Sequence, residues 1–287
     1  MGPKRLVVIS GLSGAGKTEA LHTLEDTGFY CVDNLPLGFL AEFAGEVAAS
    51  RWPGYQQVAV GIDARSAVEN LTGLPPALRQ LKSAALAVEL VFIEASDEIL
   101  LKRFSETRRR HPLSGESLPL PGAIAAERER LAPLAEYADL RVDTSAMHVH
   151  RLREWVRERV ARRVVGRLSL QLLSFGYKNG VPPESDFVFD ARGLPNPHWE
   201  AELRDRSGLD AEVRAFLDAS PLAQELAEQI GRFMLAWIPR FEAEDRPYLT
   251  VAVGCTGGRH RSVYVTERLA ESLRDGGRAV LISHRDL

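Results

Sequence analysis

The chain has 287 residues, a formal net charge of −3 at pH 7, 45% hydrophobic residues and 26% charged residues. Its length accommodates one large or two ordinary domains, and its composition is that of a soluble globular protein. The small net charge excludes a whole-chain attraction to nucleic acid, so any such site must be local. The sequence has two cysteines, Cys31 and Cys255, no signal-peptide core and no apolar run long enough to span a membrane. We therefore expect a cytoplasmic protein without membrane contact.

A glycine-rich segment near the N-terminus carries the most specific motif. It matches the pattern G-x-x-x-x-G-K-[ST] and consists of Gly11, Leu12, Ser13, Gly14, Ala15, Gly16, Lys17 and Thr18. Residues 6–9 predict a strand before it, and residues 17–27 predict a helix after it. In such a loop the backbone N–H groups surround nucleotide phosphates, Lys17 reaches the β/γ oxygens and Thr18 binds Mg²⁺. The motif predicts a nucleotide site; the alternative is a glycine turn that only closes a βα unit.

Short apolar segments alternate with helical patterns through the first half, and acidic residues follow them. These residues are Asp33, Asp63, Glu94 and Asp143. The pattern predicts an α/β fold with a doubly wound parallel sheet, which binds ligands at the carboxyl ends of its strands. Hydrolysis or transfer of a phosphoryl group needs an acidic residue for Mg²⁺. Asp63 is the first choice and Asp33 and Glu94 compete, although each of them could instead cap the next helix.

Several arginines precede the loop of residues 111–117, namely Arg103, Arg108, Arg109 and Arg110. Small P-loop kinases carry arginines on a lid, where they neutralise charge on the transferred phosphoryl group. The alternative is a solvated helix end. The chain has no Asn-Lys-x-Asp segment of the kind found in guanine-specific P-loop proteins, so the motif leaves the base undecided.

We place a domain boundary near Gly166, which gives domains of residues 1–165 and 166–287. A basic helix over residues 147–164 precedes the boundary, and its arginines predict either a solvated outer face or a surface that follows phosphates. Beyond the boundary, strands are expected over residues 168–175, 187–190, 248–253 and 278–282. A helix is expected to begin at Ser220 and Pro221. We expect its buried face to carry Leu222, Leu226, Ile230, Phe233 and Trp237.

The second half has its own glycine-containing loop over residues 254–262, between a predicted strand and a predicted helix. Glycines, backbone donors, a helix N-terminus and Arg261 make it a candidate anion site. Its spacing from Cys255 also matches cysteine-dependent phosphatases, with Asp190 as the available general acid. The interpretations are a phosphate pocket without chemistry, a phosphatase, or a tight turn alone. His198, with Arg192 and Lys178, could complete an anion pocket; it could also be a capping residue packed on Trp199.

Five segments together closely resemble the RapZ family of RNase adapters and its YvcJ-type relatives. These segments are residues 11–18, 28–36, 189–192, 194–199 and 248–262. The resemblance spans essentially the whole chain, and the sequences LPNPHW and GCTGGRHRS are not generic phosphate-loop features.

This resemblance implies a P-loop kinase-like N-terminal domain with slow ATPase and GTPase activity, and a regulatory rather than metabolic role. ATP and Mg²⁺ would use residues 11–18, with Lys17 and Asp63 in catalysis, and GTP would use Asp63, Ala64, Arg65 and Ser66. The C-terminal domain would resemble the sugar-phosphate pocket of phosphofructokinases and bind RNA and a phosphorylated amino sugar. The ligand residues carried over are Lys178, Asp190, Arg192, His198, Thr256, Gly257 and Arg261. A homo-oligomer is also implied.

The well-studied relatives end in a short basic tail that grips small RNAs, whereas this sequence ends in His284, Arg285, Asp286 and Leu287. Asp286 offsets part of the charge, so we expect weaker RNA contact at this end. Asn179 and Gly193 also stand where relatives often carry other residues, which could alter ligand choice. The alternative functions are a P-loop small-molecule kinase and a Cys255-dependent phosphatase.

Overall fold

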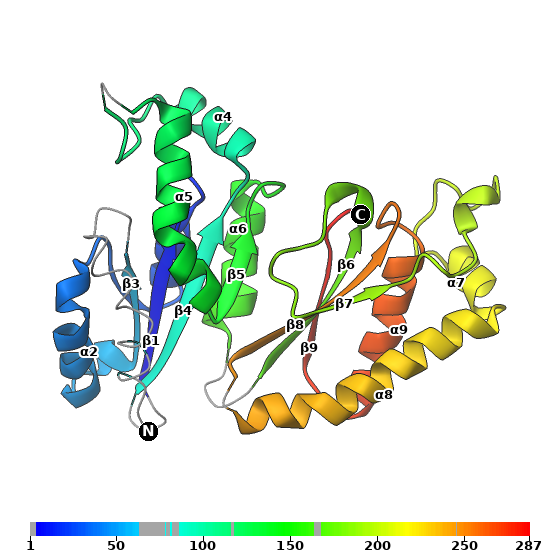
Figure 1. The fold of residues 1–287 in the computed structure, drawn as a ribbon. Helices are drawn as coiled ribbons and strands as arrows, with labels where there is room; N and C mark the ends of the chain where they lie inside the picture. Colours follow the sequence, from blue (N-terminus) through cyan, green and yellow to red (C-terminus); the bar gives the residue numbers. More distant parts are fainter. Residues whose placement is uncertain are drawn as a thin grey trace. The chain divides into compact units, whose positions relative to one another are not determined.

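The computed structural model describes residues 4–62, 78, 81, 86–115, 118–163, 168–244 and 246–287. The chain divides into two compact units, Met1–Val165 and Gly166–Leu287, which Figure 1 shows in colours from blue to red along the sequence. Among the described residues, each unit contains one sheet, and every strand pairing in both sheets is parallel. The predicted α/β fold with parallel sheets is therefore confirmed.

The N-terminal unit has a five-stranded sheet in the order β2-β3-β1-β4-β5. Its strands are β1 (Lys4–Gly11), β2 (Tyr30–Val32), β3 (Gln57–Gly61), β4 (Leu86–Glu94) and β5 (Leu140–Asp143). The central strand β1 is almost wholly buried, as its continuous apolar run predicts for a parallel sheet covered on both faces. Because all five strands run in one direction, the loop after β1 lies at the same edge as the ends of its neighbours.

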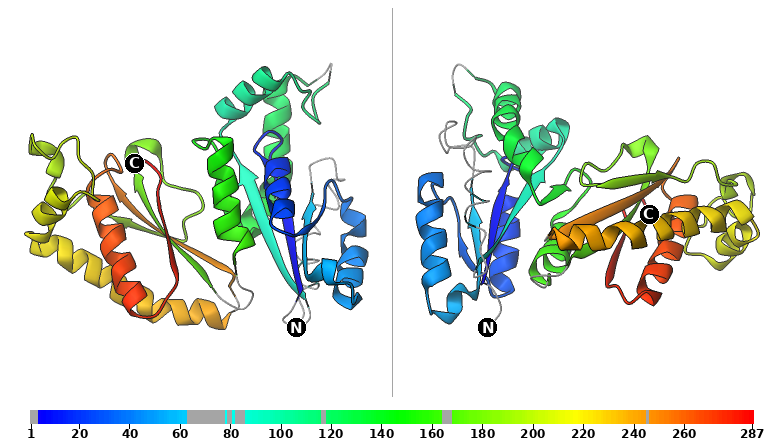
Figure 2. Two further views of the ribbon diagram at one scale, coloured as in Figure 1. Left: turned by 180° about the vertical axis from the view of Figure 1, so that it is seen from behind. Right: turned by 60° about the horizontal axis from the view of Figure 1, so that its bottom comes forward.

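Helices cover both faces of this sheet. On one face lie α1 (Lys17–Asp26), α6 (Val149–Trp155) and the π-helical turn η3 (Val156–Ala161) that continues α6. Figure 1 shows α5 (Leu120–Tyr137) in front of the sheet, and the rear view in Figure 2 shows α1 and α6 on the other side. The unit also contains α2 (Leu40–Ala49), α4 (Asp97–Thr107) and the short turns η1 (Leu37–Phe39) and η2 (Pro53–Gln56).

The basic helix predicted over residues 147–164 is packed more closely than a solvated face requires. Arg159 is 1% exposed. The Arg153 guanidinium lies 2.5 Å from the Glu19 carboxylate of α1, and Arg163 lies 2.5 Å from Glu89 of β4. Arg159 and Arg163 are therefore buried rather than solvated, whereas Arg162 is exposed, so the predicted solvated outer face describes only part of this helix.

The C-terminal unit has a four-stranded sheet in the order β7-β8-β6-β9. Its strands are β6 (Ser169–Gly176), β7 (Phe187–Asp190), β8 (Tyr248–Cys255) and β9 (Val280–His284). Its helices are α7 (Ala211–Asp218), α8 (Pro221–Ala243) and α9 (Arg261–Asp275), with short turns η4 (Tyr177–Asn179) and η5 (Pro197–Trp199). The α9 helix packs on β6, β8 and β9, and α8 packs on α9. None of the described helices of the chain is long and apolar enough to cross a membrane.

The buried face of α8 differs from the predicted one. Leu222, Phe233 and Trp237 are 58%, 36% and 40% exposed. The residues that α8 buries most fully are Ala223, Ala227, Ile230, Gly231, Met234 and Ile238. These include small residues because α8 lies close to α9, where Gly231 faces Ser272 and Leu269. Phe233 instead contacts Phe187 of the edge strand β7, at a ring-centroid distance of 5.3 Å.

Candidate phosphate-binding sites

The glycine-rich segment forms the turn between β1 and α1 at the carboxyl edge of the N-terminal sheet. Gly16 is the N-cap of α1, and Lys17 and Thr18 are its first two residues. The Lys17 Nζ donates to the backbone oxygen of Gly11 at 2.7 Å, so the lysine folds back over the loop. The backbone N–H groups at the start of α1 and the positive end of its dipole favour an anion at this position.

Two glycines of the loop are required by their surroundings. A Cβ at Gly11, which has φ of 138°, would lie 1.9 Å from the backbone oxygen of Ile93 in β4. A Cβ at Gly16, with φ of 117°, would lie 2.6 Å from Leu152 Cδ2 in α6. At both positions a side chain is disfavoured for two reasons: the backbone has a positive φ, and a neighbouring atom occupies the space of the Cβ.

Arg103 has a different role from that expected for a lid. Its Nη1 donates to the backbone oxygen of Gly14 at 3.1 Å and to Thr144 Oγ1 at 3.0 Å, and its Nη2 donates to the backbone oxygen of Thr144 at 2.7 Å. Arg103 therefore fastens the phosphate loop to the segment that follows β5. Arg108, Arg109 and Arg110 are exposed, and a lid role for them stays a prediction.

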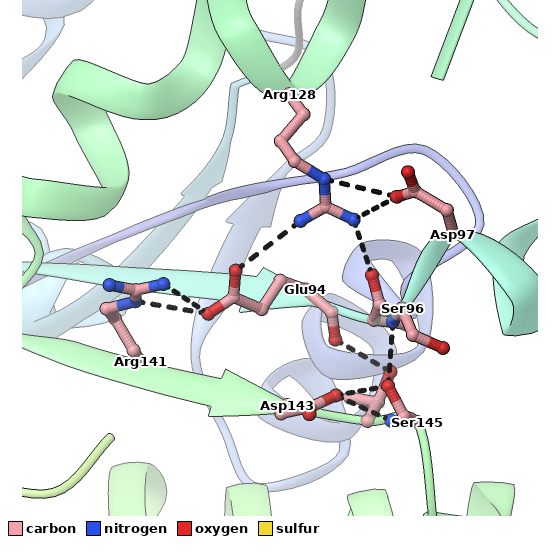
Figure 3. Close-up of polar contacts among 9 residues, drawn as sticks. Glu94, Ser96, Asp97, Arg128, Arg141, Asp143 and Ser145 are labelled. Atoms are coloured by element: carbon pink, nitrogen blue, oxygen red, sulfur yellow. Dashed lines mark hydrogen bonds and ion pairs between the residues drawn. The ribbon is translucent and has the colours of Figure 1, made fainter. Parts of the chain in front are cut away.

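The two carboxylate oxygens of Glu94 lie next to arginine guanidinium groups. Its Oε1 accepts from Arg141 Nη2 at 2.6 Å, and its Oε2 lies 3.8 Å from Arg128 Nη1. Arg128 also pairs with Asp97, as the close-up in Figure 3 shows. A carboxylate between two guanidinium groups is a poor Mg²⁺ ligand, because binding the metal would leave both cations without their partner. This geometry counts against Glu94 among the three candidates.

Asp143 and Asp33 also occupy the carboxyl edge. The Asp143 Oδ1 accepts from the Ser145 N–H at 2.8 Å and from the Ser145 hydroxyl at 2.5 Å, which makes it a turn residue (Figure 3). Asp33 is exposed, and its Oδ1 would be 2.7 Å from a Cβ at Gly61, so it lies over the end of β3. Its Oδ1 accepts from the Asn34 N–H at 2.8 Å. The first choice, Asp63, and its neighbours Ala64, Arg65 and Ser66 lie outside the described residues.

The described residues fit Mg²⁺ held with a nucleotide better than a protein-only metal site. Within the described parts of the chain, no group of three or more His, Cys, Asp or Glu could hold a metal ion. Mg²⁺ in nucleotide sites takes most of its ligands from phosphate and water and needs only one or two protein oxygens. The Thr18 hydroxyl and the Asp33 carboxylate are exposed oxygens at the correct edge of the sheet.

The ligand residues carried over to the C-terminal unit meet at the carboxyl edge of its sheet. Arg192 makes a bidentate contact with Asp190, with Nη2–Oδ2 and Nε–Oδ1 distances of 2.7 and 3.0 Å. The Arg192 guanidinium also lies over the ring of Tyr177, 4.0 Å from its centroid. The hydrogen bonds from Arg192 hold the pKa of Asp190 below its ordinary value, and the charge of Arg261 acts in the same direction.

Arg261 is 6% exposed and acts mainly as a brace. Its Nη1 donates to the backbone oxygens of Arg192 and Leu194 at 2.8 and 3.1 Å, and its Nη2 donates to Thr256 Oγ1 at 3.3 Å. The Lys178 backbone N–H donates to the backbone oxygen of Thr256 at 3.3 Å, while the lysine side chain is exposed. One guanidinium therefore joins the loop after β7 to the loop after β8, with Lys178 and Gly257 next to them.

His198 lies on η5, beside this cluster. Its ring centroid is 6.3 Å from that of His260, which is 7% exposed. Trp199 is 81% exposed, so the alternative in which His198 packs against Trp199 finds no support. Burial lowers the pKa of His260, and the nearby cation Arg259 adds to this effect, which keeps that ring neutral.

Cys255 is 3% exposed at the end of β8. Its Sγ lies 3.2 Å from Ser262 Oγ and accepts from the Gly258 N–H at 3.3 Å. Burial raises the pKa of the thiol, but hydrogen bonds from Ser262 and Gly258 and the charge of Arg261 more than offset this and lower it. The sulfur resembles a phosphatase nucleophile electronically. The thiol is nevertheless buried, and Arg261 donates to backbone oxygens instead of being available to a phosphoryl group. In addition, an ionised Asp190 has no proton to donate to a leaving group.

Sequence reasoning missed two arrangements that only the fold brings together. Ser174, His284 and Glu267 have the spacing of a hydrolytic triad, with Ser174 Oγ–His284 Nδ1 at 2.8 Å and His284 Nε2–Glu267 Oε1 at 3.1 Å. Ser174 is 0% exposed, so it has no access to a substrate and the triad is structural. The second arrangement joins Ser13 of the phosphate loop to Glu127 and His111. No spacing in the sequence reports either contact.

The fold and the loop geometry define a two-domain α/β protein whose N-terminal domain has a phosphate-binding loop after its first strand. The RapZ-like N-terminal domain matches residues 4–163, and the RapZ C-terminal domain matches residues 168–287. The chain therefore belongs to the RapZ family, as the sequence motifs predict.

Full-length relatives agree with this assignment. A nucleotide-binding protein of Alkalilimnicola ehrlichii is 53% identical over 283 residues, which cover 99% of this chain and 98% of the relative. A nucleotide-binding protein of Halorhodospira halophila is 51% identical over the same shares of both chains. Among solved structures, a shikimate kinase from Acinetobacter baumannii in complex with shikimate covers 54% of this chain and 92% of its own, with 18% identity and a TM-score of 0.37.

Proposed function

We propose that the N-terminal unit binds ATP or GTP with Mg²⁺ and hydrolyses it slowly, and that the C-terminal unit binds a phosphorylated amino sugar. The observation that carries the nucleotide proposal is the strand–loop–helix unit in which Gly16, Lys17 and Thr18 open α1 at the carboxyl edge of a parallel sheet. Relatives that match the whole chain are named as nucleotide-binding proteins, which supports the same ligand class.

In this proposal the loop N–H groups and Lys17 stabilise the negative charge on the β- and γ-phosphates. The Thr18 hydroxyl supplies one oxygen to Mg²⁺, and Asp63 or Asp33 supplies or orients another. A titration calorimeter with ATP, GTP and Mg²⁺ tests this directly. Lys17→Ala should abolish binding of both nucleotides, and wild-type protein that releases no heat with either would overturn the proposal. Labelled ATP with candidate sugars separates hydrolysis from a kinase, because a kinase would move the label to a product.

The amino-sugar proposal depends on charge arrangement. Asp190 stays ionised beside Arg192, so a carboxylate and a guanidinium lie side by side near the exposed Lys178 and Thr256. A ligand with an ammonium group and a phosphate matches both charges, since the carboxylate accepts from the amine and the cations bind the phosphate. The loop N–H groups before α9 favour the same anion.

Calorimetry with glucosamine 6-phosphate, glucose 6-phosphate and inorganic phosphate tests this match. We expect the amino sugar to bind most tightly, and Asp190→Asn to remove the preference for the amine. Asp186→Asn is the matched control, because Asp186 precedes the same strand at its opposite end and pairs with Arg246. Equal affinity of wild-type protein for all three compounds would contradict the amino-sugar assignment.

The family resemblance extends the proposal to a cytoplasmic regulator that contacts RNA and assembles as a homo-oligomer. Both cysteines are free thiols, in keeping with a reducing compartment. Filter binding of RNA at increasing salt should show a steep loss of affinity if phosphate contacts dominate. Light scattering of the purified protein measures the assembly state.

A further inference from the structure

The phosphate loop is held from its outer side by a buried carboxylate. The Ser13 N–H donates to Glu127 Oε2 at 2.8 Å, and the Ser13 hydroxyl donates to Glu127 Oε1 at 2.7 Å. Glu127 belongs to α5, 114 residues further along the chain, and is 0% exposed. Both carboxylate oxygens therefore bind a single residue of the loop, out of reach of water.

His111 completes this contact. Its Nε2 lies 3.1 Å from Glu127 Oε2, and its Nδ1 accepts from the Leu113 N–H at 3.1 Å. An Nδ1 that accepts a hydrogen bond carries no proton, so the proton of the neutral ring is on Nε2 and is donated to Glu127. His111 is 2% exposed and packs against Phe104. Glu127 thus accepts three hydrogen bonds, from the Ser13 N–H, the Ser13 hydroxyl and His111 Nε2.

The orientation of the loop peptides follows from this contact. Because the Ser13 N–H points outward to Glu127, the Leu12 carbonyl of the same planar peptide points the other way and accepts from the Ala15 N–H at 3.1 Å. Arg103 holds the Gly14 carbonyl, and the Thr144 hydroxyl holds the Ala15 carbonyl at 2.8 Å. An outward Ala15 carbonyl directs the Gly16 N–H inward, toward the start of α1.

We propose that Glu127 is a positioning residue for nucleotide binding, which fixes the loop through Ser13 so that the N–H groups from Gly16 onward converge on the phosphate. The inference rests on the proposed nucleotide function. A side chain with two acceptor oxygens is required here, because the Ser13 N–H, the Ser13 hydroxyl and His111 Nε2 all donate to it. A glutamine at position 127 has one acceptor oxygen and an NH₂ group, so its NH₂ group would face one of the donors of Ser13 or His111. Loss of this contact lets the loop adopt other conformations. Nucleotide binding must then restore the binding-competent conformation of the loop, and this lowers the affinity.

The test compares Glu127→Gln with Glu89→Gln, measured by calorimetry with ADP and Mg²⁺ at a temperature at which circular dichroism shows both variants folded. Glu89 is 1% exposed in the same unit and is bound by Arg5 and Arg163, so it controls for loss of a buried carboxylate. We expect Glu127→Gln to weaken nucleotide binding by about tenfold or more, equivalent to roughly 1.4 kcal/mol, and Glu89→Gln to leave affinity within about twofold.

Two further measurements separate positioning from general destabilisation. Hydrogen exchange at residues 12–16 of the free protein should accelerate in Glu127→Gln and stay as in wild type in Glu89→Gln. In a double-mutant cycle, Ser13→Ala should cost less affinity in the Glu127→Gln background than in wild type, because both changes break one contact. Unchanged affinity and unchanged exchange in Glu127→Gln overturn the inference and leave the nucleotide proposal intact. Absence of nucleotide binding by wild-type protein overturns both.

Discussion

Two arginines that the sequence marks as ligand candidates donate instead to backbone carbonyls. Arg103 holds Gly14 and Thr144 in the N-terminal unit, and Arg261 holds Arg192 and Leu194 in the C-terminal unit. A guanidinium has five donors in a rigid fork, so it can join two loops that have no regular secondary structure. In both units the arginine shapes a glycine-containing loop that precedes a helix, and in the proposed sites other groups would contact the ligand.

In the proposed nucleotide site, Asp33 and Glu94 can be compared as partners of Mg²⁺, alongside the first choice, Asp63. We expect Asp33→Asn to raise the Mg²⁺ concentration needed for half-maximal nucleotide hydrolysis several-fold, because Asp33 is exposed over the end of β3. Glu94→Gln should leave that concentration unchanged, since Glu94 is already bound by Arg141 and Arg128. Phosphate release measured against Mg²⁺ checks both variants. The reverse order of effects would assign the metal to Glu94.

Cys255 offers a second prediction at this scale. Its sulfur is buried and hydrogen-bonded to Ser262 and Gly258, so we expect Cys255→Ser to retain phosphate release from ATP. Lys17→Ala should abolish the same activity. A Cys255→Ser variant that loses hydrolysis of a phosphorylated substrate while keeping nucleotide binding would revive the phosphatase interpretation.

At the scale of elements, the strands and the phosphate loop were the most predictable features. Apolar runs predicted all four strands of the C-terminal sheet: β7 lies at its predicted limits, Phe187–Asp190, and β9 lies two residues later than the predicted 278–282. The buried face of α8 was not predicted, because α8 is apolar on several sides and only the position of α9 selects Ala227, Gly231 and Met234. The support of the loop by Glu127, His111 and Thr144 was equally beyond prediction, since these residues are distant in sequence.

Packing of α6 on the phosphate loop gives a prediction about glycine. Gly16→Ala should abolish nucleotide binding and destabilise the unit, because the new Cβ meets Leu152 and the backbone is left-handed there. Gly45→Ala is the opposite case, as Gly45 lies within α2 and nothing lies within 4 Å of its added Cβ. It should stabilise the protein by about 0.5–1 kcal/mol. Thermal melting with and without nucleotide measures both effects, and a stable, nucleotide-binding Gly16→Ala variant would contradict this packing.

A buried ion-pair network in the N-terminal unit predicts how the stability of the protein responds to acid. Burial raises the pKa of Glu89, but the charges of Arg5 and Arg163 and their hydrogen bonds overcome it and lower the pKa to about 2. A carboxyl whose pKa is lower in the folded state stabilises the fold above its unfolded pKa of about 4.3 and loses that contribution as the pH falls toward 2. The contribution is on the order of 3 kcal/mol.

Denaturant unfolding followed between pH 7 and pH 2 should therefore show stability falling below about pH 4.5. Glu89→Gln should be less stable at pH 7 and show a shallower fall, because its amide does not titrate. An identical pH dependence in the two proteins would mean that other carboxylates dominate acid unfolding. The mutation leaves two buried guanidinium groups without their carboxylate, so its cost at neutral pH should be large.

The place of Arg163 in this network has a consequence for where the polypeptide can be divided. Arg163 is the last described residue before the C-terminal unit begins, yet its guanidinium reaches back to β4, which lies beside the first strand of the fold. Arg163 thus ties the end of the N-terminal unit to Glu89, which also pairs with Arg5 of the first strand. A fragment that ends a few residues before Arg163 would keep all five strands of the sheet and the glycine-rich loop. It would nevertheless lose the ion pair between Arg163 and Glu89.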